Sequence, residues 1–153
     1  MAVGKLKLGN RTALTTTALN SLANSTYVSA GTITFAATSL VPLSSKLEVE
    51  VTPGTVSGNK QVLVFARASA DGTNFSTGPT SGTTTTDEPN LIFVGAVPCN
   101  TSSTLQRAQF DLAAAFGGSL PHSAQIVVKN DSGAALAASG HAVYHTSLDG
   151  DIT

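Results

Sequence analysis

Residues 46–75, KLEVEVTPGTVSGNKQVLVFARASADGTNF, contain the pattern that decides the fold. Leu47, Val49 and Val51 alternate with two glutamates at the start of this stretch. An alternation with a period of two residues is typical of a strand with one buried face and one face in water. We therefore predict a strand whose leucine and valine side chains enter the core.

A second strand is predicted for residues 60–69, because the apolar run at residues 62–65 is typical of a more central strand. Turn-forming residues lie before it, and Asp71-Gly72 forms a turn after it. We expect the two strands to be adjacent and antiparallel, with residues 54–60 (GTVSGNK) as a hairpin loop. That loop resembles a phosphate-binding loop, but Gln61 stands where the magnesium-binding Ser or Thr belongs, and no helix follows.

The composition predicts one domain with an aliphatic core. A chain of 153 residues is the usual size of a single domain and buries about 68–70% of its unfolded surface. Tryptophan is absent and charged residues make up only 11%, whereas Ser and Thr are abundant. Hydroxyl groups cost less to bury than ions. This surface therefore fits contact with other proteins, and it equally fits an exposed extracellular module.

The net charge of −1 gives the chain no general attraction to nucleic acid or to an anionic membrane. The sequence also has no run of 18 apolar residues that would span a membrane. Its first residues, MAVGKLKLGN, lack the apolar region of a secretory signal. We expect no direct nucleic-acid partner, no membrane partner, and a protein that is made in the cytoplasm and either stays there or leaves the cell by another route, such as lysis.

The remaining sequence predicts about eight short strands in a single all-β domain of residues 12–153. Asp111 is the expected N-cap of one short helix that ends at Gly117-Gly118. Residues 77–90 are rich in turn formers and predict a loop that is mobile or ordered by a partner. Further strands are expected within residues 11–23, 27–36, 89–97, 105–110, 124–129 and 134–146, the last one broken or bulged at Gly140. Residues 40–43 are short and contain a proline, so we expect them to lead into a strand.

The expected core consists of apolar residues on one face of each predicted strand. Its members are Leu47, Val49, Val51, Val62, Val64, Ile92, Val94, Ile126 and Val128. Tyr27, Ile33 and Phe35 are the expected buried residues of the strand within residues 27–36.

Residues 1–11 are predicted to form an extended N-terminal arm that binds a neighbouring subunit. Leu6 and Leu8 alternate with Lys5 and Lys7, so an extended arm has leucines on one side and lysines on the other. Arg11 adds a third positive charge, and at about 3.3–3.6 Å per residue the arm reaches nearly 40 Å. A frayed terminus or a first edge strand is the alternative.

No grouping of residues predicts an enzyme, a cofactor or a metal site. The sequence has neither the G-x-S-x-G of serine hydrolases nor the H-E-x-x-H of zinc proteases. His141 and His145 share a strand face but stand about 13 Å apart at about 3.3 Å per residue. They are expected to line a sheet face or an interface, and Cys99 is expected to be an inert thiol.

Three short segments carry a resemblance to a known family. They are residues 21–24 (SLAN), residues 66–75 (ARASADGTNF) and residues 127–130 (VVKN) with Ser132-Gly133. In these segments the chain resembles small virion proteins of tailed bacteriophages, in particular head decoration or cement proteins with a jelly-roll-like antiparallel β-sandwich. The resemblance implies a homo-oligomer (a trimer or dimer) that binds the major capsid protein on the outside of the virion capsid.

Two functions remain open at this stage. The first is a structural virion protein that cements neighbouring capsomers. The second is a carbohydrate- or receptor-binding β-sandwich, or another minor virion part such as a tail or head-completion protein, because the Ser-x-Asp-Gly pattern followed by an aromatic residue also occurs in such proteins. Sugar-binding surfaces usually present exposed aromatic rings, and this chain has only Tyr27 and Tyr144 besides its phenylalanines.

Overall fold

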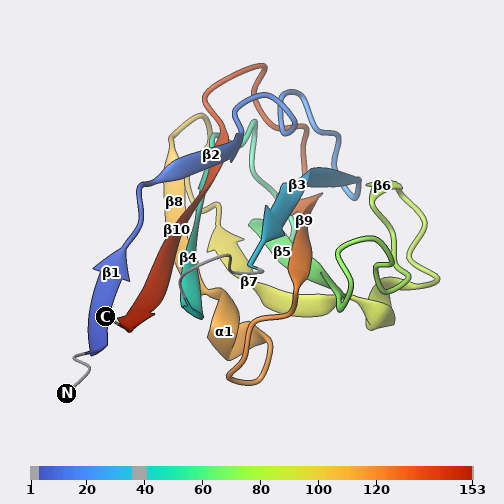
Figure 1. The fold of residues 1–153 in the computed structure, drawn as a ribbon. Coiled ribbons are helices and arrows are strands. Elements are labelled where there is room, and N and C mark those ends of the chain that lie inside the picture. Colours follow the sequence, from blue (N-terminus) through green and yellow to red (C-terminus); the bar gives the residue numbers. More distant parts are fainter. Residues whose placement is uncertain (1–3, 36–40, 153) are drawn as a thin grey trace.

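The protein is an all-β sandwich with one short helix, as the sequence predicts (Figure 1). The computed structural model describes residues 4–35 and 41–152. Strands make up 51% of the chain and helix 5%, far from the usual helix share of about 30–35%.

Ten strands and one α-helix follow one another along the described chain. They are β1 (Gly4–Leu8), β2 (Thr12–Thr15), β3 (Tyr27–Thr34), β4 (Val41–Val51), β5 (Gln61–Ser69), β6 (Ser81–Gly82), β7 (Ile92–Pro98), β8 (Gln106–Asp111), α1 (Leu112–Ala115), β9 (Ser123–Asp131) and β10 (Ala142–Ile152). A 3₁₀ turn at Glu88–Asn90 precedes β7.

The strands form two antiparallel sheets, which we call sheet A and sheet B. Sheet A has the order β1-β10-β4-β8, and β2 also pairs with β10. Sheet B has the order β6-β3-β9-β5-β7. β1 and β2 thus pair with β10, the last strand, and β3 pairs with β9, the strand before it. The chain crosses repeatedly between the two sheets. This nesting is the jelly-roll arrangement.

The predicted pairing of the two strands in residues 46–69 is wrong. β4 lies in sheet A between β10 and β8, whereas β5 lies in sheet B between β9 and β7. The segment between them is a crossover and not a hairpin: Gly54 N–H donates to the carbonyl of Ala135 (3.2 Å), and Pro53 pairs with Leu136. Nine residues separate the strands, more than the two to five of a usual hairpin loop.

The core lies between the sheets and contains the inward residues of β4, β5 and β9. Seven of the nine predicted core residues are fully buried. The three residues expected to be buried within residues 27–36 are buried as well, although Tyr27 belongs to a second apolar cluster. Ile92 and Val94 are only partly buried, because β7 is the edge strand of sheet B and its register shifts opposite Val64 and Phe65. The fully buried predicted residues are Leu47, Val49, Val51, Val62, Val64, Ile126 and Val128.

The short helix begins and ends where the sequence predicts. Asp111 accepts a hydrogen bond from Ala114 N–H (3.2 Å) in the N-cap position. Gly118 N–H donates back to the carbonyl of Ala113 (2.7 Å), with φ of +105° at Gly118. This positive φ explains the glycine, since other residues rarely adopt it.

The last strand differs from its prediction. β10 begins at Ala142, after Gly140, and runs to Ile152, six residues beyond the predicted end at residue 146. Residues 134–141 form a loop instead, and its Gly140 has φ of +86°. The extension matters because its far half is the part that pairs with β1.

Candidate binding surface

The predicted arm is an edge strand of its own domain. Residues 4–8 form β1, which pairs antiparallel with the far half of β10 at the rim of the molecule (Figure 1). The side chains of Lys5, Leu6, Lys7 and Leu8 are all exposed, with 72% of Leu6 and 69% of Leu8 accessible. The structure thus brings these four predicted residues together as one exposed strand.

The two leucines continue the outer face of sheet A, the face turned away from sheet B. Leu8 is opposite Leu148 on β10, and Leu148 is opposite Ser44 on β4. Directly opposite residues of an antiparallel pair point to the same side. Leu6 and Leu8 therefore lie on the side that carries Glu48, and the lysines lie on the other side.

The backbone of both leucines also faces outward along the sheet edge. Gly9 N–H donates to the carbonyl of Ser147 (2.9 Å), which extends the β1–β10 register by one residue. In an antiparallel ladder, residues that bond to the neighbouring strand alternate with residues whose N–H and C=O groups point away from it. By this alternation Leu8 and Leu6 direct their backbone groups to the free edge, where no other described strand lies.

The positive charge of β1 has acidic neighbours in the same chain. Lys7 is opposite Asp149 in the strand register, and Lys5 is opposite Asp151. The Asp149 carboxylate accepts a hydrogen bond from Ser147 Oγ (2.9 Å), and within the described residues Lys7 forms no ion pair. Lys7 thus keeps a free ammonium group beside the open edge.

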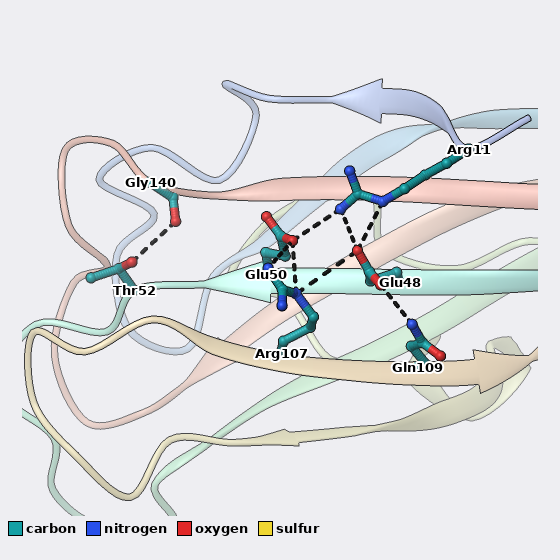
Figure 2. A network of polar contacts seen from close by, with 7 residues as sticks. All are labelled: Arg11, Glu48, Glu50, Thr52, Arg107, Gln109 and Gly140. Atoms are coloured by element: carbon teal, nitrogen blue, oxygen red, sulfur yellow. Dashed lines mark hydrogen bonds and ion pairs between the residues drawn. The ribbon is translucent and has the colours of Figure 1, made fainter.

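Arg11 takes part in a network within its own domain and is not free as the other four residues are (Figure 2). Its guanidinium group donates to Glu48 and, at 2.9 Å, to Glu50. It also lies over the ring of Tyr144, 3.2 Å from the centroid. The hydrogen bond to Glu48 is the largest cause that raises the pKa of Arg11 above its usual value.

The same network extends across sheet A to β8. Arg107 forms ion pairs with both glutamates, 2.7 Å from its Nη2 to Glu50 Oε1, and Gln109 donates to Glu48 (2.6 Å). Burial opposes the ionisation of Glu48, but the hydrogen bonds from Arg11 and Gln109 outweigh it and lower its pKa. Two arginines balance two glutamates, so the network connects β4, β8 and the segment just before β2 without leaving a net charge.

The loop at residues 77–90 covers part of the outer face of sheet B. The sequence did not predict this contact. Glu88 accepts hydrogen bonds from the hydroxyl of Tyr27 and from Lys129 Nζ (2.7 Å). Leu91 packs below it in a second apolar cluster with Tyr27, Phe65 and Val127. In the sequence, the signal for this contact was limited to one acidic residue, Glu88, shortly before the apolar Leu91. Nothing in that signal identified Tyr27 as the partner of Glu88.

The histidines and the cysteine have separate structural surroundings. His141 accepts a hydrogen bond from Thr52 N–H (3.1 Å) at Nδ1, so its Nε2–H donates to the carbonyl of Ala137 (2.8 Å). Burial lowers the pKa of His145 and raises that of Cys99 to about 11. Among the residues that the structure describes, no three His, Cys, Asp or Glu side chains lie close enough together to hold a metal ion.

Comparison with family models gives no match, and comparison with curated proteins gives none either. No helix in the described part of the chain is long and apolar enough to cross a membrane.

Proposed function

We propose that this chain is a structural virion protein that binds the outside of a bacteriophage capsid and holds neighbouring capsomers together. The observation that carries the proposal is β1, an exposed edge strand with two leucines on one side and two lysines on the other. The resemblance to phage decoration proteins supports the virion setting and the major capsid protein as partner. The expected state is a homo-oligomer on the capsid exterior.

The free edge of β1 fits an extended segment of the partner protein. The outward N–H and C=O groups of Leu6 and Leu8 can pair with such a segment as they would with another strand. Burying both leucines contributes about 3–6 kcal/mol before the cost of association. Lys7 adds a salt-sensitive preference for an acidic segment.

The pairing with β10 makes this surface better suited to binding than a free arm. A disordered segment loses conformational freedom when it binds, and this loss reduces the affinity. β1 is already held in an extended conformation by β10. The partner therefore meets a strand whose shape changes little on contact.

The carbohydrate-binding alternative receives less support from the aromatic residues. Tyr27 is buried under the loop at residues 77–90, and the ring of Tyr144 is covered by the Arg11 guanidinium group. Neither ring is free to stack on a sugar. Phe93 is exposed but lies at an edge, in a T-shaped contact with Phe65.

The test is cosedimentation of the purified protein with capsid particles that lack it. Replacing both Leu6 and Leu8 by Ser, or deleting residues 2–9, is expected to weaken binding at least tenfold with the Tm of the free protein nearly unchanged. The matched control is Leu105→Ser, a change at an exposed leucine near the opposite end of sheet A. The Lys5→Glu, Lys7→Glu double variant is expected to weaken binding mainly at low salt.

Equal binding of the deleted and complete proteins would show that β1 is not the contact. Binding of the complete protein to a glycan and not to any capsid particle would favour the alternative function.

A further inference from the structure

We infer that residues 4–8 exchange between two copies of this chain, so that β1 of one copy occupies the place beside β10 of the other. The pairing seen within one chain supplies both halves of the contact. The exchange goes beyond the proposed function, because it concerns the free protein and needs no capsid.

Little holds β1 to its own domain apart from the β10 ladder. Its order in sheet A gives it one neighbouring strand, and its four described side chains are exposed. No residue of either apolar cluster belongs to it. Detaching β1 therefore leaves the core intact, and a second copy restores the same ladder contacts that are lost, which is the condition for low-cost strand exchange.

The connection between β1 and β2 provides a hinge with a fixed end. Arg11 is held by Glu48, Glu50 and Tyr144, so the chain leaves the domain at a defined point. Gly9 and Asn10 precede it, and a Cβ at residue 9 would meet Ser147 Oγ, so a larger residue there requires that hydroxyl group to turn away. Residues 4–10 in extended form span about 23 Å at about 3.3 Å per residue, enough to reach an adjacent copy.

The edge of β10 fits this strand specifically. Leu148 lies opposite Leu8, and Asp149 lies opposite Lys7, so apolar and charged positions both match. Each copy of the chain carries a strand with this pattern in residues 5–8, so a second copy offers the same register positions to β10.

Addition of β1 to β1 of another copy is the less favourable way to join two chains. Antiparallel registers that keep the leucines on one face place a lysine opposite a lysine, as when Leu6 faces Leu6 and Lys5 faces Lys7. Like charges directly opposite each other are destabilising. Exchange onto β10 avoids this conflict because each Lys7 then faces an aspartate.

Concentration decides between the closed and exchanged forms. The exchanged dimer contains the same β1–β10 ladder as the closed chain, so the two forms differ little in their contacts. Association depends on mass action, so the exchanged dimer becomes favoured as the protein concentration rises.

Disulfide trapping tests the exchange directly. Leu8 and Leu148 form a non-hydrogen-bonded pair by the alternation described above, with a Cα separation of about 4.5 Å that a disulfide can bridge. Leu8→Cys chains are mixed with Leu148→Cys chains that carry a longer tag, and the mixture is oxidised. A covalent heterodimer is expected on a non-reducing gel, and its yield should rise with concentration.

Two controls complete the experiment. Lys7→Cys chains mixed with Leu148→Cys chains should give no more than background, because these side chains lie on opposite faces of the sheet. The Leu8→Cys, Leu148→Cys double variant at high dilution should form the bond within one chain. Cys99 is buried in all variants and should not react.

If the mixture gives no more heterodimer than the Lys7→Cys control while the double variant closes internally, β1 stays with its own chain and the exchange is wrong. If the double variant fails to close, the β1–β10 pairing is wrong and the exchange falls with it. Since only free protein is used, either failure is independent of capsid binding.

Discussion

Phe110 of β8 packs directly on the backbone of Gly95 of β7. β8 is an edge strand of sheet A, and β7 is an edge strand of sheet B. A Cβ at residue 95 would overlap the aromatic ring. The φ of Gly95 is not positive, so its role is to leave space for the ring and not to form a turn. This contact fixes the distance between the two sheets along one side of the sandwich.

Gly95→Ala is therefore expected to destabilise the protein by about 1–3 kcal/mol, because the added methyl group overpacks the contact. Chemical denaturation followed by circular dichroism measures the change. In combination with Phe110→Leu the cost should fall below the sum of the two single changes, since the residues touch. Strict additivity would show that Gly95 acts through something other than this ring.

Val49→Asp is expected to abolish cooperative unfolding. Val49 is fully buried between Val143 of β10 and Ala108 of β8, so the change leaves an unpaired charge in the core. A thermal melt is the measurement, and Leu105→Asp at an exposed position is the control. A soluble Val49→Asp protein with the Tm of the unchanged chain would mean that the β4 register is wrong.

Glu88→Ala is expected to loosen the loop at residues 77–90 without unfolding the sandwich. The change removes the acceptor for Tyr27 and Lys129. Amide hydrogen exchange of residues 77–91 should become faster, whereas exchange in β9 should change little. Asp87→Ala, at the exposed neighbouring position, is the control. Equal effects of the two variants would show that Glu88 does not hold the loop in place.

Deletion of residues 81–86 is expected to leave the domain folded. These residues are exposed, and the loop is already closed beside them: Asn90 Nδ2 donates to Thr77 Oγ1 (2.9 Å), and Gly78 lies next to the carbonyl of Asp87. Shortening a surface loop changes its closure entropy only slowly. Loss of the folded circular dichroism signal would show that the two-residue strand β6 is essential.

Protonation of Asp111 is expected to lower the stability of the protein in acid. The hydrogen bond from Lys46 is the largest cause that holds its pKa at about 2, with help from Ser44 and the N-cap bond. Because this folded-state pKa lies below the unfolded value, the stabilisation is complete above about pH 4 and is lost as the pH falls toward 2. Asp111→Asn keeps a side chain suited to the N-cap but removes the titration.

In a series of melts from pH 6 to pH 2, the Asp111→Asn protein should therefore lose less stability than the unchanged chain. Asp71, whose pKa is lowered first by the backbone of Asn74, should keep part of the acid sensitivity in both proteins. Identical pH profiles would contradict the role assigned to Asp111.

The sequence by itself determined the features that depend on neighbouring residues. The alternation of Leu47, Val49 and Val51 identified a strand and its buried face. Asp111 and Gly117-Gly118 identified both ends of the helix, because capping and positive φ are properties of single positions. Together with the turn residues these patterns were enough to predict an all-β sandwich.

Only the tertiary structure decided which strands pair and what each surface residue contacts. An alternating pattern shows which face of a strand is buried but does not specify its neighbour, so β4 and β5 were assigned to one sheet although they belong to two. For the same reason the sequence placed Arg11 on a free arm, whereas Glu48 and Glu50, 37 and 39 residues away, hold it on sheet A. Strand pairing and ion pairs between distant residues result from packing the whole chain around one core, and no local window of sequence contains that information.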